Sequence, residues 1–110
     1  MKKLYVVGNR SSKSLSPMIF NYWFKKYNIN AKYSYIQPTT KNFHNKIKEV
    51  LEKKDTLGLN ITIPFKKKII KYLNKLDVHA KKIGAVNCVT NKKSITGTNT
   101  DWTGYYKTLP

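Results

Sequence analysis

The sequence has 110 residues, of which 40% are hydrophobic and 25% charged. That length suits one domain with a single packed core, and the composition excludes a disordered tail or a fibre. No apolar run is long enough to span a bilayer, so we expect no membrane partner. The single Cys88 cannot form an internal disulfide, and one cysteine with two distant histidines cannot complete a closed zinc site. We therefore expect a cytoplasmic, metal-free protein.

The charge balance is strongly basic: 22 Lys and Arg against 5 Asp and Glu give a formal charge of +17. Such a balance raises nucleic-acid binding as a function, because clustered cations release counterions from phosphates. Arg10 is the only arginine, however, and arginine is the residue that makes bidentate hydrogen bonds to guanine and to phosphate. We interpret the lysine excess as compositional drift and do not expect nucleic acid as the main partner. The positive field still attracts small anions.

Short strands and helices alternate along the chain. Apolar and β-branched runs predict strands at residues 4–7, 31–37 and 57–63, and helical spacing predicts helices at 17–27, 40–54 and 65–73. We expect Ser16 and Thr40 to cap the first two helices. Further along we expect a helical turn at 78–83 ended by Gly84, a hairpin of strands 85–90 and 94–98, and a last helix capped by Asp101.

This alternation is typical of an α/β fold with three layers. We expect a mostly parallel sheet with helices on both faces and a C-terminal antiparallel hairpin strand. Ligands of such sheets bind beyond the carboxyl ends of the strands. Three polar loops fall there, at residues 9–16, 60–66 and 98–104. We therefore expect these three loops to form one site.

The first loop is rich in small hydroxyls, with Ser11, Ser12, Ser14 and Ser16 just before a helix. Hydroxyls and unpaired helix N–H groups suit a carboxylate or a phosphate. The plainer alternative is that Ser16 caps the helix and the other serines lie in a solvated loop.

The second loop is more specific. Strand alternation sends Ile61 and Ile63 to one face and Asn60 and Thr62 to the other. Lys66 then falls in the first turn of the next helix, where the helix macrodipole already places positive charge. A lysine at that place indicates a facing carboxylate or anion, although a solvated basic run at residues 66–68 is the alternative.

Two further polar residues lie near these loops. Asn87 interrupts an apolar strand, so its amide either braces the backbone or holds a ligand hydroxyl. Asp101 either caps a helix or faces Lys66, and a Lys–Asp pair in a cleft is a candidate proton-transfer unit.

In this order, the motifs resemble those of the shikimate dehydrogenase family, in its N-terminal substrate-binding (catalytic) domain. The matching segments are VGN at 7–9, SLSP at 14–17 with Asn21, GLNITIPFK at 58–66, IGAVN at 83–87, and GTNTD at 97–101 with Gly104. The resemblance covers the whole chain. It implies an enzyme that reduces 3-dehydroshikimate to shikimate with NADPH in aromatic amino-acid (chorismate) biosynthesis.

The resemblance also implies roles for individual residues. Ser14 and Ser16 hold the substrate carboxylate, and the ring hydroxyls are bound by Thr62, Lys66, Asn87 and Asp101. Lys66 and Asp101 are the catalytic pair: Lys66 passes a proton to or from the C3 oxygen, and Asp101 orients it.

The chain departs from the family at the edge of the implied site. Arg10 stands where the family usually has proline, and Lys13 where it commonly has histidine. Both add positive charge beside an anionic ligand.

The nicotinamide-binding half of such an enzyme needs a glycine-rich turn, and the five scattered glycines offer none. We therefore expect residues 1–100 to be the substrate-binding domain and 101–110 to begin the helix to a nucleotide-binding domain, which holds NADP. This chain alone is then inactive. One alternative is a non-enzymatic small-anion module that has lost the cofactor half, and another is a Lys-rich nucleic-acid binder. The preference for shikimate over quinate, the choice between NADP and NAD, and a homodimer are left open.

Overall fold

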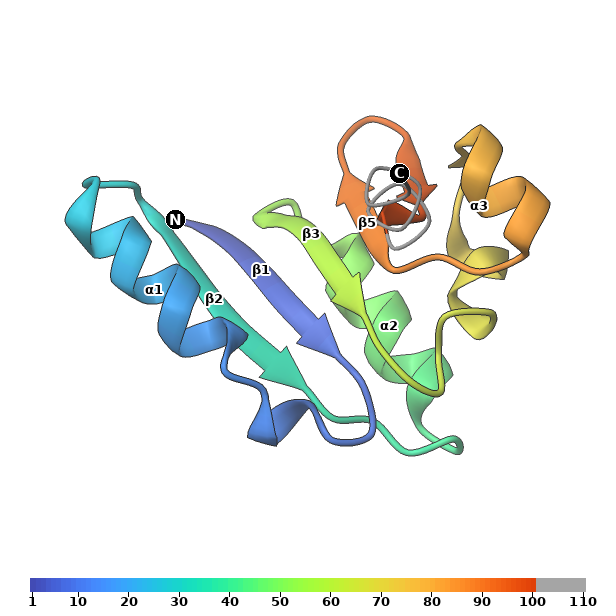
Figure 1. Cartoon of the computed structure of the whole chain (residues 1–110), viewed down its shortest axis with the longest axis horizontal. Coiled ribbons are helices and arrows are strands. Elements are labelled where there is room, and N and C mark those ends of the chain that lie inside the picture. Colours follow the sequence, from blue (N-terminus) through green and yellow to red (C-terminus); the bar gives the residue numbers. More distant parts are fainter. Residues whose placement is uncertain (101–110) are drawn as a thin grey trace, which may run out of the picture.

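The computed structural model describes residues 1–100. The chain runs through six strands, three α-helices and two short 3-10 helices in this part (Figure 1). In order these are β1 (Lys2–Val7), η1 (Ser11–Lys13), α1 (Ser16–Lys26), β2 (Ala31–Ile36), α2 (Phe43–Glu52), β3 (Thr56–Ile61), η2 (Lys68–Tyr72), β4 (Lys75–Leu76), α3 (Val78–Ile83), β5 (Cys88–Asn91) and β6 (Ile95–Thr98).

The six strands form one mixed sheet in the order β2-β1-β3-β5-β6-β4. Strands β2, β1 and β3 pair in parallel, as do β4 and β6, whereas β5 pairs antiparallel with both β3 and β6. The β5–β6 pair is the C-terminal hairpin that the sequence predicted. The predicted α/β fold with a mostly parallel sheet is therefore confirmed.

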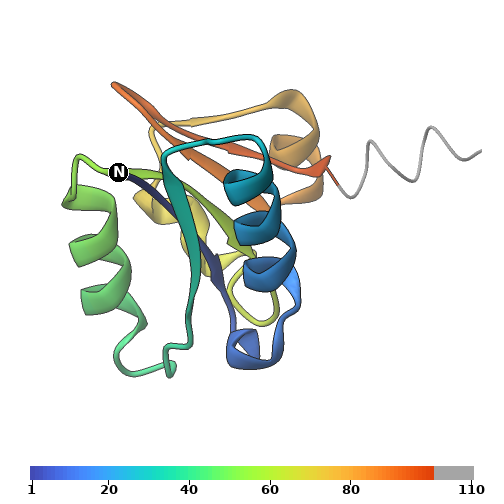
Figure 2. The same ribbon diagram turned by 90° about the vertical axis from the view of Figure 1, so that its left-hand side faces the viewer.

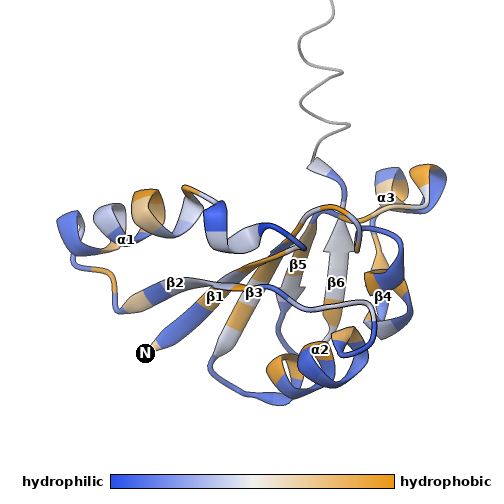
Figure 3. Cartoon of the chain, turned by 90° about the horizontal axis from the view of Figure 1, so that it is seen from below, coloured by the Kyte–Doolittle hydropathy of each residue, from blue (hydrophilic) through white to orange (hydrophobic). Residues whose placement is uncertain are grey.

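Helices cover both faces of the sheet. Figure 2 shows α1 on one side of the strands and α2 on the other, and Figure 3 shows the same separation from below. The turns that leave the carboxyl ends of β1 and β3 lie at the same edge of the sheet, because these two strands are parallel neighbours. Two of the three predicted loops are brought together there.

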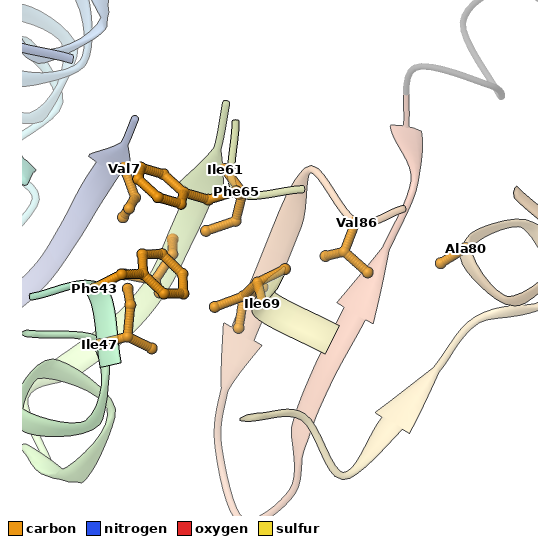
Figure 4. Packing of buried hydrophobic residues seen from close by; sticks show 10 residues of the cluster. Val7, Phe43, Ile47, Ile61, Phe65, Ile69, Ala80 and Val86 are labelled. Carbon is orange, nitrogen blue, oxygen red and sulfur yellow. The ribbon is translucent and has the colours of Figure 1, made fainter. Parts of the chain in front are cut away.

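The core lies between the sheet and the layer formed by α2 and η2. Phe43 and Ile47 of α2 and Ile69 of η2 are buried against Val7 and Ile61 (Figure 4). The Phe43 ring stacks on the Phe65 ring with centroids 4.3 Å apart. The predicted apolar face of α2 is confirmed, although α2 begins at Phe43, after a turn in which Thr39 and Asn42 exchange hydrogen bonds.

Helix α1 differs from the prediction in two ways. It begins at Ser16, so Ser16 is its first residue and does not cap it; the Ser14 Oγ accepts a hydrogen bond from the Ser16 N–H instead, at 3.1 Å. None of its residues is buried, and Ile19, Trp23 and Tyr27 of the predicted apolar face are exposed. Periodicity identified the helix correctly, but it could not show how little of the helix the sheet covers.

The segment after β3 also differs. The predicted helix at 65–73 is a turn followed by the five-residue 3-10 helix η2, and Lys66 lies in that turn. The argument from a helix macrodipole therefore does not apply to Lys66. Two residues after η2 the chain is back at the sheet, where the Asn74 N–H donates to the Ile95 carbonyl at 2.8 Å. Ile63 is 71% exposed, so strand alternation ends at Ile61.

The end of the described chain follows the prediction closely. Helix α3 is capped by the Asp77 side chain, which accepts from the Ala80 N–H at 2.7 Å, and it ends at Gly84 with φ of 74°. That left-handed conformation favours glycine. Strand β4 has only two residues and no sequence signal of its own. Asp101 and the helix predicted from it lie outside the described residues.

Candidate functional site

A cleft of about 540 Å³ opens where the β1–α1 loop faces the β3–η2 turn. The first segment contributes Arg10 and Ser14, and the second contributes Thr62 and Lys66. The wall is completed by Val6, Asn9, Ser11 and Ile63. The cleft thus joins hydroxyls, one guanidinium and one ammonium group around a space large enough for a small anionic ligand.

The serines of the first loop have separate roles. The Ser11 hydroxyl lies within hydrogen-bonding distance of the Gly8 and Ile36 carbonyls, at 3.0 and 2.6 Å, and is buried. The Ser12 hydroxyl donates to the side chain of Gln37 at 2.6 Å. Both therefore hold the loop against β2. Ser14 faces the cleft, and because its oxygen accepts from the backbone, its own O–H remains a donor for a ligand.

A second polar cluster lies beside the first turn of α1 and involves a residue that sequence reasoning missed. The Tyr33 hydroxyl donates to Asn60 Oδ1 at 2.7 Å, and the Ser16 side chain hydrogen-bonds to the same hydroxyl. Burial raises the pKa of Tyr33 to about 12, against the opposing Ser16 hydrogen bond and with a further contribution from Cys88. Alternation along residues 31–37 placed Tyr33 on a strand, but only the sheet order brings it to Asn60.

Thr62 and Lys66 take their positions from the backbone. The Thr62 hydroxyl donates to the Val7 carbonyl at 3.1 Å, which leaves its lone pairs to accept from a ligand hydroxyl. Lys66 is half-buried, and its carbonyl accepts from the Val86 N–H at 2.8 Å. Two predicted site residues of the second loop therefore line the same cleft as Ser14.

Asn87 binds the third loop. Its Nδ2 lies 2.8 Å from the Thr100 hydroxyl, and its Oδ1 accepts from the Thr100 N–H at 2.9 Å. Asn87 thus braces the backbone of the third loop, one of the two roles that the sequence left open, and binding of a ligand hydroxyl stays a prediction. The Asn87 carbonyl also accepts from the Ile61 N–H at 2.8 Å, so the Asn87 backbone lies beside the end of β3.

The described residues hold no group of three or more His, Cys, Asp and Glu side chains that could bind a metal ion. Residues 1–100 also contain no helix long and apolar enough to cross a bilayer. Their four glycines lie in separate places: a Cβ atom at Gly8 would meet Thr62, one at Gly58 would meet Val89, one at Gly97 would meet Leu73 and Val86, and Gly84 ends α3. None of them forms a strand-to-helix cradle for a dinucleotide, so this part of the chain does not fit a nicotinamide cofactor.

Residues 6–89 match the family model described as the shikimate dehydrogenase substrate binding domain. The chain belongs to this family. The matched range includes the whole cleft, and the family resemblance drawn from the sequence motifs is confirmed.

Curated relatives of the family agree. The shikimate dehydrogenase (NADP(+)) of Streptococcus sanguinis is 41% identical over 106 residues, covering 96% of this chain and 37% of the relative. That of Pelagibacter ubique is 41% identical over 116 residues, covering 99% of this chain and 42% of the relative. The chain thus spans about two fifths of the length of these relatives.

Solved structures of the family share the fold. Shikimate dehydrogenase from Aquifex aeolicus superposes with a TM-score of 0.88 at 32% identity, over 99% of this chain and 41% of that one. Shikimate 5-dehydrogenase from Listeria monocytogenes, solved in complex with shikimate and NAD, gives a TM-score of 0.88 at 30% identity, over 97% of this chain and 37% of that one.

Proposed function

We propose that this chain is the substrate-binding domain of an NADP-dependent shikimate dehydrogenase, which reduces 3-dehydroshikimate to shikimate. The observation that carries the proposal is the shared cleft, in which Ser14, Thr62 and Lys66 meet from two loops. These are three of the residues that the family motifs assign to the substrate. Family membership supports the same assignment.

In this proposal the substrate carboxylate binds at the start of α1. Ser14 donates its O–H to the carboxylate, since its oxygen is already occupied by the Ser16 N–H. Ser16 lies in the first turn of the helix, where the helix macrodipole favours negative charge, and its hydroxyl reaches the carboxylate by turning from Tyr33 to the ligand. Arg10 supplies a guanidinium at the mouth of the same cleft.

The ring hydroxyls then face the β3–η2 turn. Thr62 accepts from one hydroxyl, because its own proton is directed to the Val7 carbonyl. Asn87 stands beside the end of β3 and binds a hydroxyl only by releasing Thr100 or by using a spare lone pair. Asp101, the partner assigned to Lys66, lies outside the described residues, so its role stays a prediction.

The chemical role proposed for this domain is proton transfer. Reduction of the C3 ketone builds negative charge on oxygen, and the Lys66 ammonium stabilises it and delivers the proton. NADPH, when bound, supplies the hydride. The described residues make no dinucleotide cradle, so we assign cofactor binding to the nucleotide-binding part of the enzyme and divide the chain at residue 100, as the sequence predicted.

The remaining expectations follow from this proposal. The pathway is aromatic amino-acid biosynthesis, and the free Cys88 thiol fits a cytoplasmic enzyme. The partners are shikimate and 3-dehydroshikimate, without metal, membrane or nucleic acid. A homodimer stays an open prediction.

Two measurements test the proposal. Calorimetric titration of shikimate onto the chain should show saturable binding, and a Thr62→Ala/Lys66→Ala variant should lose it. Fusion of the chain to the remaining part of the Streptococcus sanguinis enzyme should then restore NADPH formation from shikimate. Binding without activity in the fusion would favour the small-anion module. Duplex DNA binding with a steep salt dependence, without shikimate binding, would favour the nucleic-acid binder.

A further inference from the structure

Helix α1 begins at Ser16 of the anion site, two residues after Ser14, but it is poorly anchored by apolar burial. None of its residues is buried, and Met18 and Tyr22 are more than 60% exposed. Core packing therefore does not fix the position of its N-terminus, and specific contacts must do so. The hydrogen bonds of Asn21 and the ring stacking of Phe20 both join α1 to one residue of the neighbouring strand β2, Tyr33.

The side chain of Asn21 on α1 bonds to both backbone polar groups of Tyr33, its N–H and its carbonyl. Its Nδ2 donates to the Tyr33 carbonyl at 2.8 Å, and its Oδ1 accepts from the Tyr33 N–H at 2.8 Å. Strand β2 is an edge strand, so these two backbone groups have no strand to pair with. The Asn21 carboxamide thus supplies the donor and the acceptor that a neighbouring strand would supply.

Tyr33 is fixed along its whole length. Its ring stacks on Phe20 of α1 with centroids 4.8 Å apart and planes 11° apart, and its hydroxyl bonds to Asn60 of β3. The same hydroxyl bonds to the Ser16 side chain. Tyr33 therefore joins the start of α1 to β3, which leads directly into the Thr62 side of the cleft.

We infer that Asn21 is a positioning residue for the substrate site, an inference that rests on the proposed function. The Asn21–Tyr33 pair sets the position of α1 on β2, and the helix transmits it to Ser16, five residues or about 7.5 Å away along the axis. Ser16, and with it Ser14, whose Oγ accepts from the Ser16 N–H, is thereby held beside the cleft that Ser14 lines together with Thr62 and Lys66. Asn21 itself does not touch the ligand.

The test is a double-mutant cycle on shikimate affinity. Asn21→Ala should weaken shikimate binding by about tenfold. If Asn21 acts through Ser16, the same change should cost less than about threefold in a Ser16→Ala background, yet keep its full effect in a Thr62→Ala background. Asn21→Gln, which keeps the amide on a longer side chain, should recover part of the affinity and serves if the alanine variant fails to fold. Unchanged affinity of Asn21→Ala, or losses that simply multiply with Ser16→Ala, would overturn the inference.

A second readout does not depend on the ligand. The Ile19 N–H donates to the Leu15 carbonyl at 3.1 Å in α1, and the Lys46 N–H donates to the Asn42 carbonyl at 3.1 Å in α2. Asn21→Ala, or Asn21→Gln in its place, should speed hydrogen exchange at Ile19 and leave Lys46 unchanged, whereas Asn45→Ala on the exposed side of α2 should leave Ile19 unchanged. If the unmutated chain does not bind shikimate, the proposed function fails. The exchange at Ile19 then decides the inference about α1, which unchanged exchange would overturn.

Discussion

Gly8 lies so close to Thr62 that a Cβ atom at position 8 would overlap the threonine hydroxyl. The two residues follow neighbouring parallel strands, β1 and β3, and the Thr62 hydroxyl bonds to the Val7 carbonyl just before Gly8. Because glycine has no side chain, position 8 leaves room for the Thr62 hydroxyl at the cleft.

Gly8→Ala should lower the free energy of unfolding by about 1 to 3 kcal/mol and weaken shikimate binding, because Thr62 must move. Thr62→Ala removes the overlapping hydroxyl, so the stability loss caused by Gly8→Ala should largely disappear in that background. Urea unfolding of the four proteins measures both effects. An equal loss in the two backgrounds would show that the overlap is not the cause.

Ser14→Ala and Ser16→Ala should separate capping from ligand binding. Ser14 bonds to the first helical N–H, so its loss should cost about 1 kcal/mol of stability. Each change should weaken shikimate binding by about 1.5 to 3 kcal/mol, the usual contribution of a hydrogen bond to a charged group. Thermal unfolding and calorimetry on the two variants provide the comparison. Unchanged shikimate affinity in both variants would show that the substrate carboxylate does not bind at this loop.

Lys66→Ala in the fusion enzyme should lower kcat by about 100-fold or more and change KM little, because proton transfer contributes mainly in the transition state. Lys67→Ala is the matched control: the neighbouring lysine is exposed, outside the cleft, and carries the same charge. Steady-state kinetics with shikimate distinguish the two positions. Similar kcat values for both variants would show that Lys66 is not catalytic and belongs to a solvated run of lysines.

Arg10→Ala should weaken shikimate binding by about two- to fivefold at low salt, and the difference should shrink as ionic strength rises. Lys13→Ala removes the same charge from an exposed residue that does not line the cleft, so it should have less effect. Titrations at low and high ionic strength compare the variants. Equal effects would mean that only the overall positive field matters.

Tyr33→Phe should change the alkaline pH dependence of stability. The folded-state pKa of Tyr33 is raised to about 12, above the value near 10 of an unfolded chain, so the unfolded state loses this proton first as pH rises. The buried neutral hydroxyl therefore contributes stability that is present below pH 10 and is lost between about pH 10 and 12. Relative to Tyr33→Phe, the free energy of unfolding of the unmutated chain should fall by up to about 3 kcal/mol across that range. Urea unfolding at pH 9 and 12 measures the difference, and parallel pH profiles would contradict the assignment.

The sequence by itself determined the order and type of most elements and the family. Strand and helix periodicities are local properties, so β1, β2, α2 and α3 were predictable within a few residues, as was the Gly84 cap. The motif order also predicted Ser14, Thr62 and Lys66 as substrate residues, and these three line one cleft, because loops at the carboxyl ends of neighbouring parallel strands lie together.

Only the tertiary structure decided how each residue is used. Whether a helix face is covered depends on what packs over it, so the exposure of Ile19 and Trp23 on α1 could not be read from spacing. The bracing role of Asn87 depends on Thr100, and the joining role of Tyr33 depends on Asn60 and Asn21. These contacts link residues 12 to 27 positions apart, and a hydrogen bond between distant residues leaves no periodic signal in a single sequence.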